Sequence, residues 1–210
     1  MTGTAVLLLS VAVAAMVGDW LAVAAGNRRA EWLLKPAVMV LLVAAALALD
    51  PTSESARALL VAGLVLSLVG DVALMLPADL FVVGLGAFLL AHVAYVIALW
   101  VLGVDLGGFV VGLAFVLVAS AVVGRRILTG ARQASPTLGP PVTAYLVVIS
   151  AMVVSAFGVG TAMAVGGALL FYASDAVLGW TRFVTDIPRG RVVVMVTYHL
   201  GQLGLLLAFV

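Results

Sequence analysis

The chain has 210 residues, of which 66% are hydrophobic and only 9% are Asp, Glu, Lys or Arg, and its mean hydropathy is +1.35. Soluble domains carry roughly 25% charged residues, so this composition excludes a water-soluble protein and predicts one that lies in the lipid bilayer. The net charge of +1 argues against a nucleic-acid partner, and the absence of cysteine excludes disulfides and cysteine-based metal sites.

Eight apolar runs follow one another along the chain, and most approach the ~20 residues that a helix needs to cross a bilayer. Short breaks rich in Gly, Pro, Asp and Arg separate the runs, as is typical of connections between helices. The runs cover approximately residues 4–25, 32–49, 57–76, 81–102, 108–124, 140–157, 160–181 and 190–210. We therefore predict an all-α fold, a polytopic membrane helix bundle of eight transmembrane helices that forms a single transmembrane domain over residues 1–210.

The basic residues predict how these helices cross the membrane, because Lys and Arg are retained in cytoplasmic loops. Only Arg57 lies near an even-numbered loop. The other nine basic residues lie near odd-numbered loops and are Arg28, Arg29, Lys35, Arg125, Arg126, Arg132, Arg182, Arg189 and Arg191. We therefore expect the odd-numbered loops in the cytoplasm and both termini on the non-cytoplasmic side. A single Lys against nine Arg is typical of a GC-rich bacterial genome, so we expect the bacterial plasma (inner) membrane.

Ionisable side chains inside the predicted spans indicate a functional site, because each costs at least ~2.5 kcal/mol near the bilayer centre. The candidates are Asp19, Asp71, His92, Asp175 and His199. Their polar neighbours are Ser67, Tyr95, Tyr145, Tyr172, Ser174, Tyr198 and Gln202, with Lys35 at the start of the second span. At about 1.5 Å of rise per residue, most of them lie in the cytoplasmic half of the predicted bundle, which favours a water-filled pocket open to that side.

Several of these residues have plain structural explanations as well. A single membrane histidine often forms a hydrogen bond to a neighbouring helix. Asp19 is compatible with an interfacial anchor, and all four tryptophans fall near span ends, as in an aromatic belt. Lys35-Pro36 is compatible with a first helical turn whose lysine extends to the headgroups. Two aspartates at matching positions of separate helices, Asp71 and Asp175, are better explained by a shared site.

A faint internal repeat links the two halves of the chain. The third and seventh runs contain a small residue followed by aspartate, as Gly70-Asp71 and Ser174-Asp175, and the run after each contains a histidine. Because these two runs cross the membrane in the same direction, the pattern fits a duplicated four-helix unit with parallel topology. We expect glycines in the spans to allow close helix packing, and glycine-rich faces would also support a homodimer.

The residue types restrict the chemistry of such a site. A hydrolytic metal centre is disfavoured, because there is no His-x-x-Glu-His spacing and only two histidines are present. Intramembrane aspartyl proteolysis also uses two membrane aspartates, but no Pro-Ala-Leu element accompanies them here. Paired carboxylates suit a third task, which is to protonate an ether-type bond and to stabilise the resulting oxocarbenium ion.

Four ordered motifs in this eight-helix frame resemble the YhhN-like lysoplasmalogenase family, from about residue 30 to the C-terminus. The motifs are Leu66-Ser-Leu-Val-Gly-Asp71; Phe81-Val-Val-Gly-Leu-Gly-Ala-Phe88 followed by Ala91-His-Val-Ala-Tyr95; Gly167-Ala-Leu-Leu-Phe-Tyr-Ala-Ser-Asp175 with Arg182-Phe183; and Thr197-Tyr-His-Leu-Gly-Gln202. Lys35-Pro36 at the head of the second span fits the resemblance as well.

The resemblance implies a multi-pass membrane hydrolase that cleaves the vinyl ether bond of lysoplasmalogens, giving a fatty aldehyde and a glycerophospho-base. It implies that Asp71 and Asp175 are catalytic and that the partner is a single-chain phospholipid from the bilayer, without nucleic acid, metal or organic cofactor. The expected substrate-binding residues are Lys35, Ser67, His92, Tyr95, Tyr145, Ser174, Arg182, Tyr198, His199 and Gln202. Lys35 and Arg182 are expected to meet the phosphate.

Two other classes of protein would carry the same buried Asp and His residues. A small proton-coupled transporter places them in a cavity that opens alternately to both faces, but the outer halves of the third and seventh spans are nearly all apolar. A lipid-binding protein without enzymatic activity would keep its binding after loss of both aspartates.

Overall fold

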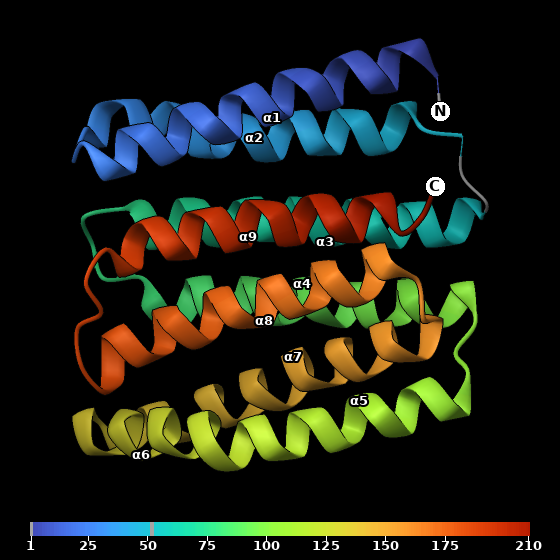
Figure 1. Ribbon diagram of the computed structural model, residues 1–210. Helices are drawn as coiled ribbons and strands as arrows, with labels where there is room; N and C mark the ends of the chain where they lie inside the picture. Colours follow the sequence, from blue (N-terminus) through green and yellow to red (C-terminus); the bar gives the residue numbers. More distant parts are fainter. Residues whose placement is uncertain (1, 51–52) are drawn as a thin grey trace.

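The computed structural model describes residues 2–50 and 53–210, and the regular structure in these ranges is helical throughout (Figure 1). The helices are α1 (Gly3–Ala24), α2 (Arg28–Ala48), α3 (Glu54–Met75), α4 (Phe81–Leu102), α5 (Leu106–Ala119), α6 (Arg125–Ala134), α7 (Gly139–Val159), α8 (Ala162–Phe183) and α9 (Gly190–Leu207). Eight helical stretches of the described chain are long and apolar enough to cross a membrane. The prediction of an all-α, multi-pass membrane protein with eight spans is confirmed.

The fifth span is longer than the apolar run that predicted it. A π-helical segment, Ser120–Gly124, joins α5 to α6, so the helix continues to Ala134 where the sequence suggested a loop after residue 124. Three arginines interrupt the apolar run here, but arginine is a good helix former. The helix therefore continues as an amphipathic segment that buries Ile127 and Ala131 on one face.

The second span also begins earlier than the sequence suggested. Asn27 caps α2 by accepting a hydrogen bond from the amide of Ala30, and the helix starts at Arg28. Glu31 is therefore helical, and Pro36 lies inside α2 instead of in its first turn. The prediction that Pro36 begins the helix is wrong, because a polar helical turn precedes the apolar run.

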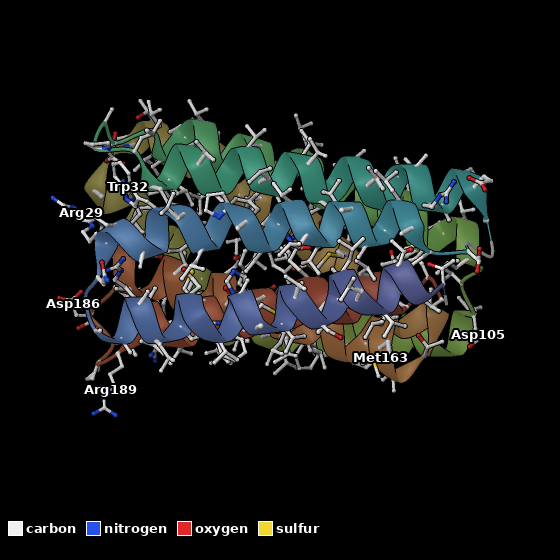
Figure 2. All side chains as sticks on the ribbon, turned by 90° about the horizontal axis from the view of Figure 1, so that it is seen from above. Arg29, Trp32, Asp105, Met163, Asp186 and Arg189 are labelled. Atoms are coloured by element: carbon white, nitrogen blue, oxygen red, sulfur yellow. The ribbon has the colours of Figure 1, made fainter. Side chains whose placement is uncertain are left out.

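The helices alternate in direction, so that their connections gather at two ends of the bundle (Figure 1). Both termini lie at one end. The connections α1–α2, α3–α4, α6–α7 and α8–α9 lie at the other end, where Figure 2 places Arg29, Trp32, Asp186 and Arg189. Asp105 and Met163 lie at the end with the termini. We call the end with the four connections the basic end.

The chain closes on itself through its last helix. Consecutive spans of the described chain pack against each other, except that α4 packs against α7 in place of α5. α5 packs against α7, the span that follows it. α9 packs against α8 and returns to contact α1 and α2. This return brings α9 close to α2, although nearly the whole chain separates them, and it encloses the polar side chains at the basic end.

Glycines let the helix backbones touch, as predicted. A Cβ atom on Gly167 of α8 would lie 2.5 Å from the backbone nitrogen of Leu205 in α9, and one on Gly204 would lie 2.7 Å from the Cα of Gly167. Gly108 and Gly112 allow α5 to approach α7 in the same way. Small residues at helix contacts are the usual means of close packing in lipid, because the bilayer offers no hydrophobic force between helices.

Candidate active site

A cavity of about 210 Å³ opens at the basic end between α2, α3, α8 and α9, and both candidate aspartates line it. We call it the polar cavity. Its lining residues are Arg28, Glu31, Trp32, Lys35, Asp71, Leu74, Met75, Phe88, Ser174, Asp175, Leu178, Thr181, Gly190, Arg191, Val194, Met195 and Tyr198. The third and seventh spans therefore contribute to one site, as the matching aspartates suggested.

Asp71 is buried and has a partner on each carboxylate oxygen. Its Oδ1 lies 2.9 Å from Nζ of Lys35, and its Oδ2 accepts a 2.6 Å hydrogen bond from the hydroxyl of Tyr198. Lys35 is only 6% exposed, so the alternative interpretation of this lysine as a headgroup anchor is wrong. The ammonium supplies a counter-charge to the Asp71 carboxylate and holds it in place.

Asp175 has a different environment, although it lines the same cavity. The hydroxyl of Tyr145 donates a hydrogen bond to Oδ2. Among the described residues, its Oδ1 takes no hydrogen bond and no Lys or Arg forms an ion pair with it. Asp175 is half-buried. One oxygen is therefore free to exchange a proton with a molecule in the cavity.

A second cavity, smaller and almost entirely apolar, adjoins the first. Its volume is about 60 Å³, and we call it the apolar pocket. Its lining residues are Leu74, Phe81, Leu85, Phe88, Val123, Gly124, Ile127, Val142, Tyr145, Leu146, Ile149, Tyr172, Asp175, Ala176, Leu178, Gly179 and Phe183. Leu74, Phe88, Asp175 and Leu178 line both cavities, so the Asp175 carboxyl lies at the junction of a polar and an apolar compartment.

Ser174 and Tyr198 are the other expected substrate-binding residues that line the polar cavity. The Ser174 hydroxyl donates a 3.1 Å hydrogen bond to the carbonyl of Val194 and so ties α8 to α9 beside the cavity. Ser67, Tyr95 and Gln202 form a separate network behind it. There, the Tyr95 hydroxyl donates a 2.7 Å hydrogen bond to Oε1 of Gln202 and lies 3.4 Å from Oγ of Ser67.

Neither histidine lines the polar cavity. Nδ1 of His92 lies 2.6 Å from the Phe88 carbonyl of its own helix, and its ring packs edge-on against Phe171. Nδ1 of His199 accepts a 3.1 Å hydrogen bond from Trp20. Both rings are fully buried, which fits the structural interpretation of a membrane histidine.

Asp19 and Trp20 do not form an interfacial anchor. Asp19 is fully buried, and neither of its carboxylate oxygens has a hydrogen-bond partner among the described residues. Trp20 extends inward to the buried His199 instead of to the headgroups. The anchor and belt interpretations are therefore wrong for these two residues, because α1 packs this part of its surface against the bundle.

Arg182 lies apart from the polar cavity. Its guanidinium lies 2.8 Å from Oδ2 of Asp79 and 3.9 Å above the centre of the Phe81 ring. Arg28, Glu31 and Arg191, which were not candidates from the sequence, line the cavity instead. One sequence signal was present, because Glu31 precedes Lys35 by four residues and so shares its face of α2.

Arg191 and Glu31 form the charged mouth of the cavity. The Arg191 guanidinium contacts both oxygens of Glu31, at 2.8 and 2.7 Å. The Arg191 side chain is 56% exposed, whereas that of Glu31 is 9% exposed. Both contacts come from Nη2, and a guanidinium that binds a carboxylate can also bind phosphate.

No group of three or more His, Cys, Asp or Glu side chains in the described ranges has the arrangement of a metal site. The polar groups that line the cavity include carboxyl, hydroxyl, ammonium and guanidinium groups.

Comparison with known proteins supplies three findings. The model of the YhhN family matches residues 30–209. A segment of 68 residues is 40% identical to human lysoplasmalogenase TMEM86B. This segment covers 32% of this chain and 30% of the human protein. A segment of 73 residues is 40% identical to the rat protein of the same name, covering 35% of this chain and 31% of that protein. The match spans less than a third of these relatives, and no solved structure matches the chain.

Proposed function

The chain belongs to the YhhN family, and we propose that it is a membrane hydrolase that cleaves the vinyl ether bond of lysoplasmalogens, releasing a fatty aldehyde and a glycerophospho-base. The name of its curated relatives, lysoplasmalogenase, supports this reaction. The observation that carries the proposal is the position of Asp175, which lines both the polar cavity and the apolar pocket.

A lysoplasmalogen has the same division into a polar and an apolar part. Its vinyl ether joins the glycerol headgroup to a single alkyl chain, so the scissile group lies where the polar part of the molecule ends. A headgroup in the polar cavity and a chain in the apolar pocket would bring this group to Asp175. Such a lining of mostly apolar walls with a few convergent polar groups is typical of small-molecule sites.

The different partners of the two aspartates support different roles. Asp175, with a free oxygen, is the proton donor, and the Tyr145 hydroxyl orients its other oxygen. Asp71 remains a carboxylate beside Lys35 and stabilises positive charge that develops in the cavity. The division resembles that of the two carboxyl groups of glycoside hydrolysis, which act as acid and as electrostatic partner.

In the proposed reaction, Asp175 transfers its proton to the vinyl carbon on the chain side, and the π electrons form the new C–H bond. The ether oxygen then shares the positive charge as an oxocarbenium ion. Water adds to the carbon bound to that oxygen, and the Asp175 carboxylate takes one proton from the water, which regenerates the acid. The resulting hemiacetal transfers its hydroxyl proton to the glycerol oxygen as the C–O bond breaks, giving aldehyde and alcohol.

The phosphate of the headgroup binds at the mouth of the cavity in this proposal. Lys35 is committed to Asp71, which leaves Arg191 and Arg28 as the cations of the lining. Arg191 would exchange part of its contact with Glu31 for the phosphate, because a guanidinium binds both carboxylate and phosphate.

The test is aldehyde release by the purified protein from a lysoplasmalogen, beside an ordinary ester lysophospholipid. We expect aldehyde from the first and no hydrolysis of the second. Asp175→Asn should abolish turnover while the protein stays folded, whereas Asp79→Asn, whose exposed carboxylate pairs with Arg182, should leave it unchanged. Full activity of Asp175→Asn would exclude the scheme, and no aldehyde from the wild-type protein would exclude the proposed function.

We also propose that the basic end faces the cytoplasm of a bacterial inner membrane, since most basic residues flank its connections. The chain has no cysteine, so single cysteines report orientation directly. In intact spheroplasts, an impermeant maleimide should label Asp105→Cys and not Asp186→Cys until the membrane is opened. Labelling of Asp186→Cys but not of Asp105→Cys in intact spheroplasts would contradict the proposed orientation and indicate the opposite one.

A further inference from the structure

A long apolar groove runs along α4, α5 and α7 on the outer surface of the bundle. Its volume is about 860 Å³, and its walls include Trp100, Phe109, Leu113, Leu117 and Val147. Trp100, Leu117 and Val147 are more than half exposed, so the groove is open toward the hydrocarbon that surrounds the protein. It therefore accepts a molecule that arrives sideways from the membrane.

The groove adjoins the apolar pocket. Gly124 and Leu146 line both spaces, and together they form the boundary between them. Gly124 has no side chain, and a Cβ added there would still be 3.9 Å from the nearest atom of Leu146. At this point of the boundary the Leu146 side chain therefore faces Gly124, which has no side chain of its own.

The π-helical segment Ser120–Gly124 forms the helix side of this boundary. Ser120 and Gly124 line the groove, and Val123 and Gly124 line the apolar pocket. A π turn within a membrane helix is uncommon and frequently lies at a functional site, because it widens the helix and redirects the side chains around it. The local distortion thus coincides with the point where the two spaces meet.

The size of the apolar pocket requires an outlet for a long chain. Its volume of about 60 Å³ is less than half of the roughly 150 Å³ of a cavity that holds one benzene molecule. Only the first few carbons of an alkyl chain can fit. The groove continues from Leu146 to Val154 of α7, and the eight steps between these residues correspond to about 12 Å at the usual rise per residue.

We propose that the alkyl chain of the substrate leaves the apolar pocket between Gly124 and Leu146 and lies in the groove between α5 and α7. This inference rests on the proposed function, since it begins at the vinyl ether beside Asp175. The groove then determines which chain lengths the protein accepts, and its opening toward lipid is the path by which a single-chain lipid enters and the long-chain aldehyde leaves.

A substitution at the boundary tests the route. The Gly124→Leu variant places an apolar side chain between the two spaces, and Val122→Leu, on the exposed face of the same π segment, is the matched control. The measurement is the ratio of kcat/KM for a hexadecenyl substrate to that for a butenyl substrate, whose chain ends inside the apolar pocket. We expect Gly124→Leu to lower this ratio by about tenfold or more, and Val122→Leu to leave it unchanged.

A ratio that is unchanged in both Gly124→Leu and Leu146→Trp, with both proteins folded, would overturn the route. A binding experiment tests it without turnover. A lysoplasmalogen with a diazirine at the end of its hexadecenyl chain is photolysed with the Asp175→Asn protein, and labelled peptides are identified by mass spectrometry. Labels on the groove residues of α4, α5 or α7 support the route, and labels confined to other helices contradict it.

The failure of this inference is distinguishable from that of the proposed function. If the wild-type protein releases no aldehyde from either substrate, the proposed function fails. If it releases aldehyde but the boundary variants and the label do not implicate the groove, only the chain route fails.

Discussion

Nζ of Lys35 lies 2.9 Å from Oδ1 of Asp71 in the interior of the protein, where the two side chains are 7% and 2% exposed. α2 and α3 supply the two charges, and Tyr198 of α9 occupies the remaining oxygen of Asp71. The ion pair thus joins three helices at the base of the polar cavity. Its loss has consequences for stability and for activity that can be measured separately.

Lys35→Met is expected to destabilise the protein strongly, by about 3 kcal/mol or more, because it leaves the Asp71 carboxylate buried without its counter-charge. Lys35→Met combined with Asp71→Asn should recover most of this loss, since no charge then remains unpaired, but not the activity. Thermal unfolding in detergent measures the first effect, and aldehyde release measures the second.

The exposed pair between Arg57 and Glu54 is the control for this prediction. Its Glu54→Gln variant should cost less than about 1 kcal/mol, because the Glu54 side chain is 75% exposed and solvent screens its ion pair. If Lys35→Met combined with Asp71→Asn is as unstable as Lys35→Met alone, the unpaired charge of Asp71 is not the cause of the lost stability.

Tyr145→Phe should lower kcat by roughly tenfold to a hundredfold with little change in KM, because it removes the hydrogen bond that orients the acid Asp175. Tyr95→Phe is the comparison. It removes a hydrogen bond to Gln202 behind the cavity, so it should lower the melting temperature and leave kcat per folded molecule unchanged. Equal losses of kcat in the two variants would mean that the Tyr145 contact has no special role.

Arg191→Gln should raise KM for a phosphate-bearing substrate by about tenfold, the usual effect of losing a charged hydrogen bond, and should not change KM for an alkenyl glycerol without phosphate. Arg182→Gln should change neither value, because Arg182 binds Asp79 and Phe81 away from the cavity. Steady-state kinetics on the two substrates distinguish the arginines. A rise in KM for Arg182→Gln alone would assign the phosphate to Arg182, as the sequence suggested.

Gly167→Ala should destabilise the protein markedly or prevent its folding, because its new methyl group would meet backbone atoms of α9 at 2.5 to 3.0 Å. Gly166→Ala should be neutral, or more stable by up to about 1 kcal/mol, because its methyl group would meet no atom within 4 Å. The melting temperatures of these two adjacent variants, in one detergent, provide the test. Similar values for both would contradict the close packing of α8 against α9.

Hydropathy alone determined the class of protein and the number of spans. Apolar runs separated by Gly, Pro and charged breaks leave few other folds, and the family resemblance directed attention to Asp71 and Asp175. The span boundaries that the sequence predicted wrongly lie at helix ends. The second span began at Arg28 and the fifth continued to Ala134, because good helix formers extend a helix beyond its apolar part.

The partners of each polar residue depended on the tertiary structure. Tyr198 is 127 residues from Asp71, and Glu31 is 160 residues from Arg191, so local spacing gave no sign of either contact. Arg182 and Arg191 are close in sequence, yet the last turn of α8 directs one to Asp79 and the first turn of α9 directs the other to Glu31.

The sequence does not reveal these partners because helices in lipid lack a distinct polar face. A soluble helix reveals its buried side by the alternation of polar and apolar residues, whereas a membrane helix is apolar on nearly all sides. Sequence therefore determines where along its helix Asp175 lies but not the direction in which its side chain points. Close contacts such as that of Gly167 with α9 set the rotation of each helix, and only those contacts bring Asp175 to the junction of the polar cavity and the apolar pocket.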